Sequence, residues 1–220
     1  MQIEPTVEFL RAAVDRFVGD AAPDQSWLRL QRQTAPAIDP ALAEHRHALL
    51  VWLNAWGCRL RYARSGEEDL FDSGLAGWWQ RWGAALPPPQ TPLAELPRDV
   101  LAPLGPAFSE LAATRVAAGP RGRSLGPTAA SKLLYALRPA ALPPWDEAIA
   151  RALHGRRDGD AYAAHVALNR GWALRLLDEA GLAESELATK LGHPGRSLVK
   201  MLDDYCYLVC TRGLGPDNLS

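Results

Sequence analysis

Apolar residues recur along this chain at the spacing of an amphipathic helix. Val7, Leu10, Val14 and Phe17 fall on one helical face, and comparable patterns follow through most of the chain. No run longer than a few residues alternates apolar and polar positions as a half-buried strand does. The pattern therefore predicts an all-α protein of about ten helices.

Glycine, proline and capping residues divide this pattern into segments. The run PPPQTP at 87–92 is expected to be extended and to connect two helical layers, 1–86 and 93–212, of one domain that spans residues 1–220. The expected helices cover residues 7–18, 27–33, 40–56, 67–86, 98–104, 108–118, 127–138, 147–153, 162–180, 185–191 and 197–211.

Composition limits the classes to which the protein can belong. At 220 residues the chain can bury a sizeable core, and 48% apolar against 22% charged residues is ordinary for a globular protein. No apolar run approaches the roughly 20 residues that span a bilayer, so no membrane association is expected. The N-terminal segment lacks the basic start and apolar core of a signal peptide, so we expect a cytoplasmic location.

The cysteines do not indicate a disulfide framework, because there are only three of them. Cys206 and Cys210 share a face of the last expected helix, but a metal site would need more ligands nearby. We therefore expect buried thiols, no metal and no cofactor.

Charge is unevenly distributed along the chain, whose formal net charge is −1. The segment from Arg115 to Arg157 holds 8 basic and 2 acidic side chains. A basic segment in a neutral protein is typical of a surface that binds a polyanion such as nucleic acid, and a solvated helical face is the alternative. A smaller basic cluster after the expected helix 40–56 consists of Arg59, Arg61 and Arg64.

The segment SLGPTAASKLLYAL combines a glycine turn with a helix start inside the basic segment. Gly126 and Pro127 open the helix, and the first amide groups of a helix lack backbone partners and can bind phosphate. A plain helix start with proline in the first turn is the alternative. The candidate nucleic-acid-binding residues are Arg121, Arg123, Gly126, Thr128 and Ser131.

The segment LPPWDEAIARAL places an acid at the start of the next helix. A helix of about three turns followed by a proline-rich return would bring Asp146 close to the turn at Gly126. Asp146 is then a candidate catalytic carboxylate, Lys132 lies between the two segments, and Trp145 is placed to line a pocket. An acid that only caps its helix is the alternative.

Together, the glycine turn, the helix, the proline-rich turn and the P-x-D at the next helix start resemble the helix-hairpin-helix DNA glycosylases. Leu125, Gly126 and Ala129 match the hairpin signature and Asp146 matches the family's aspartate, within residues 121–153. The resemblance implies a glycosylase-like half of the fold and a hairpin that grips the DNA backbone. It also implies that the aspartate stabilises a sugar cation or activates water.

The sequence departs from the family in having one hairpin glycine and Thr128 where bifunctional members use a lysine. Lys132 lies one turn further along the helix and is the second candidate catalytic residue. The resemblance therefore implies a DNA-binding, monofunctional base-excision enzyme, in which Asp146 stabilises the sugar as a flipped base is released. The segment WLNAWGCRL also resembles uncharacterised bacterial proteins of this general kind, which implies no chemistry.

Two other functions fit the sequence. Residues 184–204 resemble a DNA-binding helix-turn-helix, with Arg196 and Lys200 on its second helix, although Leu198 on that helix indicates a core-facing side. A non-catalytic helical scaffold or partner-binding protein is the other alternative. A glycosylase would hold Asp146 in an open basic cleft, a regulator would expose the second helix, and a scaffold would bury or cap the acid.

Overall fold

The structure is a computed structural model that describes residues 4–20, 24–117 and 122–214. These residues form ten α-helices, joined by turns and by four short 3-10 or π segments. The described residues contain no strand, and their only β pairing is an isolated antiparallel bridge between Arg115 and Ser124. The all-α fold predicted from the sequence is confirmed.

Three of the first four helices begin at capping side chains that the sequence supplies. Thr6 accepts the backbone N–H of Phe9 at the start of the first helix, while Asp24 and Asp69 accept backbone N–H groups at the starts of two others. The four helices are α1 (Val7–Asp20), α2 (Gln25–Gln33), α3 (Ala43–Ala55) and α4 (Leu70–Trp82).

The proline-rich connector lies against the core. Arg138 is buried and donates from Nε to the backbone oxygen of Pro87, and Leu93 N–H donates to the oxygen of Ala140 at 2.8 Å. These hydrogen bonds hold the connector against the turn at residues 138–142. The segments around it are three 3-10 turns, η1 (Gly83–Ala85), η2 (Leu93–Glu95) and η3 (Arg98–Leu101), and α5 (Leu104–Ala113).

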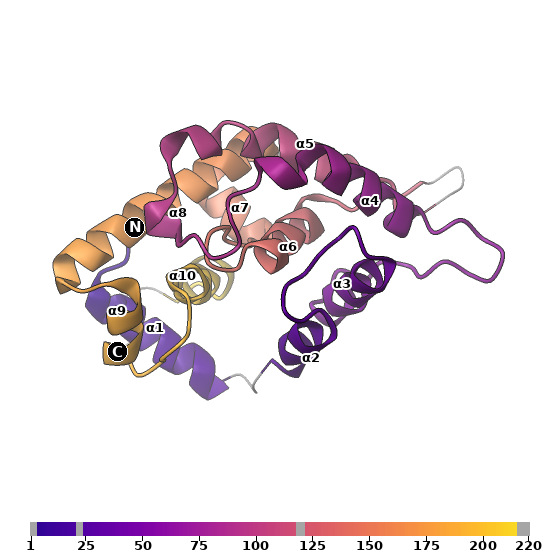
Figure 1. Cartoon of the computed structure of the whole chain (residues 1–220). Helices are drawn as coiled ribbons and strands as arrows, with labels where there is room; N and C mark the ends of the chain where they lie inside the picture. The colour runs from indigo at the N-terminus through magenta and orange to yellow at the C-terminus, as the bar shows by residue number, and fades with distance from the viewer. Residues whose placement is uncertain (1–3, 21–23, 118–121, 215–220) are drawn as a thin grey trace.

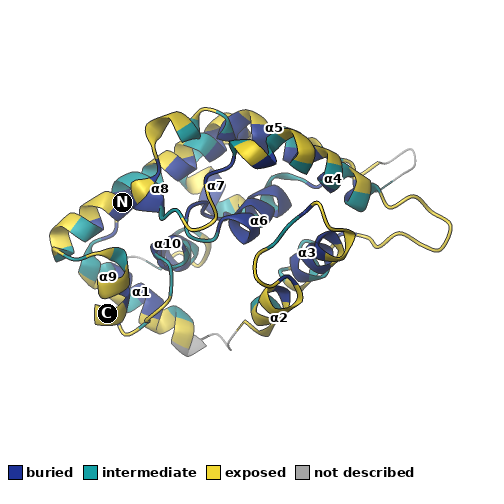
Figure 2. Cartoon of the chain, in the orientation of Figure 1, coloured by how far each residue is buried: buried dark blue, intermediate teal, exposed yellow. Residues whose placement is uncertain are grey.

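The central helix of the fold is α6 (Pro127–Leu137), which is apolar on nearly all sides. From Ala129 to Arg138 every residue is buried except Lys132, which is half-buried, and Figure 2 shows this helix almost entirely in the buried colour. The remaining helices are α7 (Glu147–His154), α8 (Gly159–Ala180), α9 (Glu184–Lys190) and α10 (Leu198–Cys206), which continues as a π-helical turn (Tyr207–Thr211).

The helices pack around α6 in pairs (Figure 1). The long helix α8 lies along α5, α1 packs against α10, and α2 packs against α3. In Figure 1, α1 and the α2–α3 pair lie on the lower side of the molecule, α6 and α10 lie near the middle of the view, and α4, α5 and α8 lie along the upper side. None of the described helices is long and apolar enough to cross a membrane.

Two predicted helix starts lie three residues too early, because side chains near each start bond elsewhere. The helix expected from residue 40 begins at Ala43, since Asp39 accepts the N–H of Ala41 in a preceding turn. The helix expected from residue 67 begins at Leu70, since the carboxylate of Glu67 is bonded by Arg61 and by the N–H of Arg64.

The helix expected over 108–118 also ends early, at Ala113. The chain then runs extended, and the N–H of Val116 donates to Arg123 at 2.8 Å while that of Leu125 donates to Thr114 at 2.9 Å. The two sides of a narrow hairpin thus lead from α5 into α6. The expected stop at Gly119-Pro120 lies outside the described residues.

Candidate nucleic-acid interface

The turn that opens α6 has the conformation that the sequence indicates. Gly126 has φ +81°, a value that favours glycine, and Pro127 occupies the first helical position. The N–H of Gly126 donates to Ala112 at 2.9 Å, which fixes the turn against the end of α5. No side chain caps the N-terminus of α6, so its first amide groups are not satisfied by a cap.

The segment that carries Asp146 folds back beside this turn. Trp145 donates from Nε1 to the backbone oxygen of Pro127 at 3.3 Å, and its N–H donates to Ser131 Oγ at 3.2 Å. The structure therefore brings the start of α6 next to the start of α7, as a return of the chain between them requires. Ser131 is fully buried and its hydroxyl lies within bonding distance of the oxygens of Thr128 and Trp145, so it faces the protein and not solvent.

Asp146 is half-buried and both its carboxylate oxygens accept hydrogen bonds. Oδ1 caps α7 by accepting the N–H of Ile149 at 2.8 Å, and Oδ2 accepts the hydroxyl of Thr211 at 2.7 Å. An acid that caps its helix is the arrangement expected of the scaffold alternative, whereas a glycosylase was expected to hold this carboxylate in an open basic cleft. Thr211 is the last residue of the π-helical turn, which was not anticipated as a neighbour of this acid. Burial, and then Asp146, raise the pKa of Cys210 to about 11, so this thiol is protonated at neutral pH.

Trp145 is a core side chain with 1% of its surface exposed. Its indole packs edge-on against Phe108 and Tyr162, with ring centroids 5.6 and 5.3 Å away, and lies 5.3 Å from the ring of His165. The side chain therefore supports the start of α7 from inside and does not border an open surface.

Lys132 reaches toward α3 and not toward Asp146. Its Nζ donates to the backbone oxygen of Trp56 at 2.6 Å and lies 5.5 Å from the centre of that indole. Trp56 follows the last residue of α3, so the cation sits at the carbonyl end of that helix, where the helix dipole favours it. Tyr135, one turn further along α6, stacks on Trp56 with centroids 5.8 Å apart.

Arg123 makes the link on which the candidate interface depends. Its Nη1 donates to the backbone oxygen of Arg59 at 2.9 Å, and its Nη2 to that of Cys58 at 3.3 Å. The hairpin before α6 is thereby joined to the loop after α3. Arg121, another candidate from the sequence, lies outside the described residues.

The base of that loop is held in one conformation. Arg59 has φ +53°, which is uncommon for a side chain other than glycine. The next residue, Leu60, is 4% exposed, and Asn54 both accepts its N–H at 2.6 Å and donates to its oxygen at 2.9 Å. The amide of Asn54 thus pairs with Leu60 as a strand would, and holds the loop where Arg123 bonds it.

Both of the segments joined by this link carry further basic side chains. Of those in the described part of the chain, only Arg61 forms an ion pair, with Glu67; Glu68 and Asp69 follow in the same loop. The arginines without an ion pair therefore come from both the hairpin and the loop. We call these residues the basic patch: Arg59, Arg61, Arg64, Arg115 and Arg123.

The remaining cations of the basic segment are engaged elsewhere. Arg138 is buried on Pro87, while Arg151 and Arg157 both pair with Glu147 and Arg156 pairs with acids in its own loop. The basic segment of the sequence therefore contributes open charge mainly at the hairpin, and the cluster RLRYAR supplies the rest.

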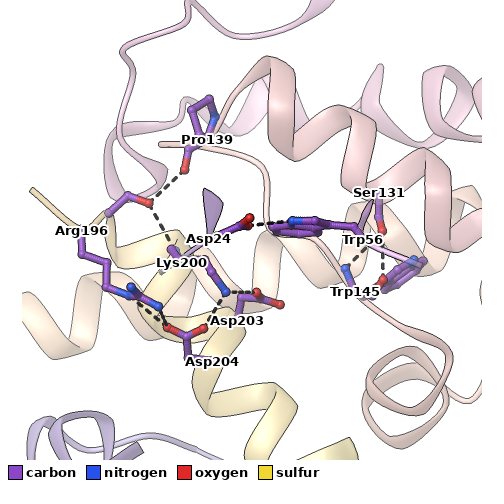
Figure 3. Close-up of polar contacts among 10 residues, drawn as sticks. Asp24, Trp56, Ser131, Pro139, Trp145, Arg196, Lys200, Asp203 and Asp204 are labelled. Atoms are coloured by element: carbon purple, nitrogen blue, oxygen red, sulfur yellow. Dashed lines mark hydrogen bonds and ion pairs between the residues drawn. The ribbon is translucent and has the colours of Figure 1, made fainter. Parts of the chain in front are cut away.

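A second polar cluster lies on α10, and Figure 3 shows its members converging. Lys200 donates from Nζ to Asp203 at 2.7 Å and to Asp204 at 2.6 Å, and Arg196 bonds the other oxygen of Asp204, whose side chain is fully buried. Burial alone would lower the pKa of Lys200, but the two carboxylates raise it above its ordinary value. The K-x-x-D-D spacing on one helix is the sequence signal for this cluster.

The cluster assigns α10 a place in the core. Leu198 and Met201 have no exposed surface, and Phe17 of α1 covers Lys200 with its ring centre 4.8 Å from Nζ. Arg196 and Lys200 are thus occupied by carboxylates of α10. The second helix of residues 184–204 is therefore not a protruding one.

Comparison with protein-family models, with curated proteins and with solved structures finds no match to this chain.

Proposed function

We propose that this protein binds nucleic acid through the basic patch. The observation that carries the proposal is the pair of hydrogen bonds that Arg123 donates to the backbone oxygens of Cys58 and Arg59. These bonds join two arginine-bearing segments that are far apart in the sequence. Arg59, Arg64, Arg115 and Arg123 have no ion pair within the described residues, so their charge is available to an external anion.

Phosphate groups suit this surface for a second reason. The uncapped start of α6 lies directly after the hairpin, and backbone amides at a helix start bind phosphate without sequence preference. Guanidinium groups of arginine bind phosphate oxygens through two parallel hydrogen bonds. The proposed contacts are with the backbone of the nucleic acid and position it without reading bases.

A paired charge reversal tests the patch. Arg64 and Arg115 are exposed and their side chains make no hydrogen bond to the described residues, so Arg64→Glu/Arg115→Glu removes two cations while sparing the hydrogen bonds of Arg123. We expect an affinity for duplex and single-stranded oligonucleotides about tenfold lower, measured by fluorescence anisotropy.

The matched control is Arg151→Glu/Arg156→Glu, which makes the same change of charge at exposed sites outside the patch. Its affinity should remain close to that of the unchanged protein. An equal loss in both double variants would assign binding to net charge alone. No binding by the unchanged protein at low salt would end the proposal.

Beyond nucleic-acid binding, we propose that the protein excises a base and that Asp146 is the catalytic residue. The resemblance to the helix-hairpin-helix glycosylases motivates it, and the bonds of Trp145 to Pro127 and Ser131 support it by placing the acid beside the α6 turn. In this mechanism the carboxylate, oriented by Ile149 and Thr211, stabilises positive charge that develops on the sugar. Lys132 bonds Trp56 and holds α3 against this half of the molecule.

The substitution Asp146→Asn tests this chemistry. Asparagine still caps a helix, so α7 should persist while the negative charge is lost. On duplexes that carry uracil, alkylated or oxidised bases, we expect the unchanged protein to release one base class and the variant to lose at least about a hundredfold in rate. Equal rates in both proteins, or no release by either, would leave nucleic-acid binding without catalysis.

A further inference from the structure

An exposed aromatic ring stands in the middle of the basic patch. Tyr62 is 47% exposed, and the other large apolar side chains so exposed among the described residues are the aliphatic Val18, Leu28, Leu42 and Leu174. Tyr62 follows Arg61 and precedes Arg64 by two positions, so basic residues lie on both sides of it along the chain. Packing of the core does not account for an exposed tyrosine among arginines, whereas a ligand that binds this ring would.

The loop that carries Tyr62 is closed at both ends. On one side Asn54 bonds both backbone groups of the buried Leu60. On the other side Glu67 accepts Arg61 Nη2 at 2.7 Å and the N–H of Arg64 at 3.0 Å, and its own N–H donates to the oxygen of Arg64 at 2.9 Å. The tip is therefore fixed across its base before any ligand arrives.

The ring of Tyr62 is supported from one direction only. The imidazole of His47 on α3 lies with its centroid 6.4 Å away at an interplanar angle of 48°. No other ring among the described residues packs against it. An aromatic side chain held in this way costs little further ordering when a planar group packs against it.

We infer that this loop binds an unpaired nucleotide, with its base stacked on Tyr62 and its phosphates on Arg59 and Arg64, which form no ion pair within the described residues. Within a duplex both faces of each base are already stacked on neighbours, whereas single strands offer free faces to aromatic side chains. The substrate class is therefore nucleic acid with a single-stranded or unpaired segment. This inference rests on the proposed function and assigns the kind of nucleic acid that the patch takes.

The variants Tyr62→Ala and Tyr62→Phe test the stacking. We expect Tyr62→Ala to weaken binding of a fluorescein-labelled oligothymidylate about tenfold, and binding of a blunt duplex of the same length by less than about twofold. Tyr62→Phe retains the ring and should bind both as the unchanged protein does. Because Tyr62 is exposed, none of these variants should alter the thermal unfolding midpoint.

The outcomes separate this inference from the proposed function. If Tyr62→Ala leaves oligothymidylate binding unchanged while Arg64→Glu/Arg115→Glu weakens it, the patch binds nucleic acid but the stacking is overturned. A loss on duplex as large as that on the single strand would also overturn it. Failure of the unchanged protein to bind either probe would instead overturn the proposed function.

Discussion

His165 is a buried neutral histidine at the contact between α7 and α8. Its side chain is 1% exposed, and its Nδ1 lies 3.1 Å from Nε2 of His154. Burial, followed by the neighbouring His154, lowers the pKa of His165 to about 3. The ring packs on Trp145, so its protonation state bears directly on the segment that positions Asp146.

This pKa makes folding stability depend on pH. Histidine in the unfolded chain has a pKa of about 6.5, so between there and about 3 the unfolded state binds one more proton. The contribution of neutral His165 to the free energy of unfolding is therefore complete above pH ~6.5, and it is lost as the pH falls toward ~3. For His165→Gln, which cannot be protonated, we expect a pH profile of the free energy of unfolding that is shallower by up to about 1.4 kcal/mol per pH unit in this range.

Urea denaturation at a series of pH values measures both profiles. The comparison is between slopes, so any constant loss of stability caused by replacing a buried side chain does not affect it. Parallel profiles for the unchanged protein and His165→Gln would contradict the low pKa of this residue.

At the scale of elements, α5 and α8 approach closely where two glycines meet. A Cβ added at Gly159 would lie 2.2 Å from the backbone oxygen of Gly105 and 2.3 Å from Ser109 Oγ. A backbone oxygen cannot move aside as the end of a side chain can. The contact between the two helices therefore requires glycine at position 159.

We expect Gly159→Ala to lower the free energy of unfolding by about 1–3 kcal/mol, because the helices must separate to admit the methyl group. Gly171 in the same helix is the matched control, since its nearest atom is Arg175 Nη1 at 3.8 Å. Gly171→Ala should raise the stability by roughly 0.4–1 kcal/mol through the unfolded chain. Similar changes in both variants, measured by urea denaturation, would show that the close approach is not limiting.

Elements were easier to predict in type than in extent. The helix at 127–138 and the one headed by Asp146 occur where glycine, proline and an acidic cap predict them, because those signals act within a single turn. The starts of α3 and α4 were misplaced, since Asp39 and Glu67 bond other groups of the folded protein. Such competition depends on which segments meet, and helical periodicity does not specify it.

At the scale of the whole molecule, the basic patch is assembled from two distant segments. Arg123 contacts Arg59 and Cys58, which precede it in the sequence by 64 and 65 positions. These contacts join the loop that carries Arg61 to the hairpin that carries Arg115. Polyanion binding by such a surface releases counterions, so the affinity should fall steeply with salt.

Salt dependence of the same paired variant measures how many phosphates the patch engages. The slope of log affinity against log salt concentration should be less steep by about 2 in Arg64→Glu/Arg115→Glu, because each arginine neutralises roughly one phosphate. The slope of Arg151→Glu/Arg156→Glu should equal that of the unchanged protein. A slope unaffected by the patch variant would place the phosphates elsewhere on the molecule.

The candidate residues from the sequence have been brought together only in part. Asp146 and the turn at Gly126 do lie side by side, and the spacing of a helix and a return was enough to suggest it. Ser131, in contrast, faces inward, and Trp145 is in the core, because each completes the packing between α6 and α7. Their roles in binding or catalysis stay predictions.

Some residues that complete the site lie in parts of the chain that are distant from it in the sequence. Thr211 bonds Asp146 from the end of the last helix, and Asn54 fixes the loop of Tyr62 from within α3. The three arginines around a single tyrosine in RLRYAR were a local signal for the loop. No local signal indicated Thr211, because its position follows from the π-helical turn.

By itself the sequence determined that the chain is helical, that a glycine turn opens a central apolar helix, and that Asp146 heads the next one. These features follow from periodicity, caps and turn residues, which act over a few neighbouring positions. Only the tertiary structure decided which basic side chains remain exposed without an ion pair. Arg138 is buried against the backbone oxygen of Pro87 and Lys200 pairs with carboxylates of α10, whereas Arg64 and Arg115 are exposed to solvent. Availability of a charge depends on partners distant in sequence, and folding selects those partners.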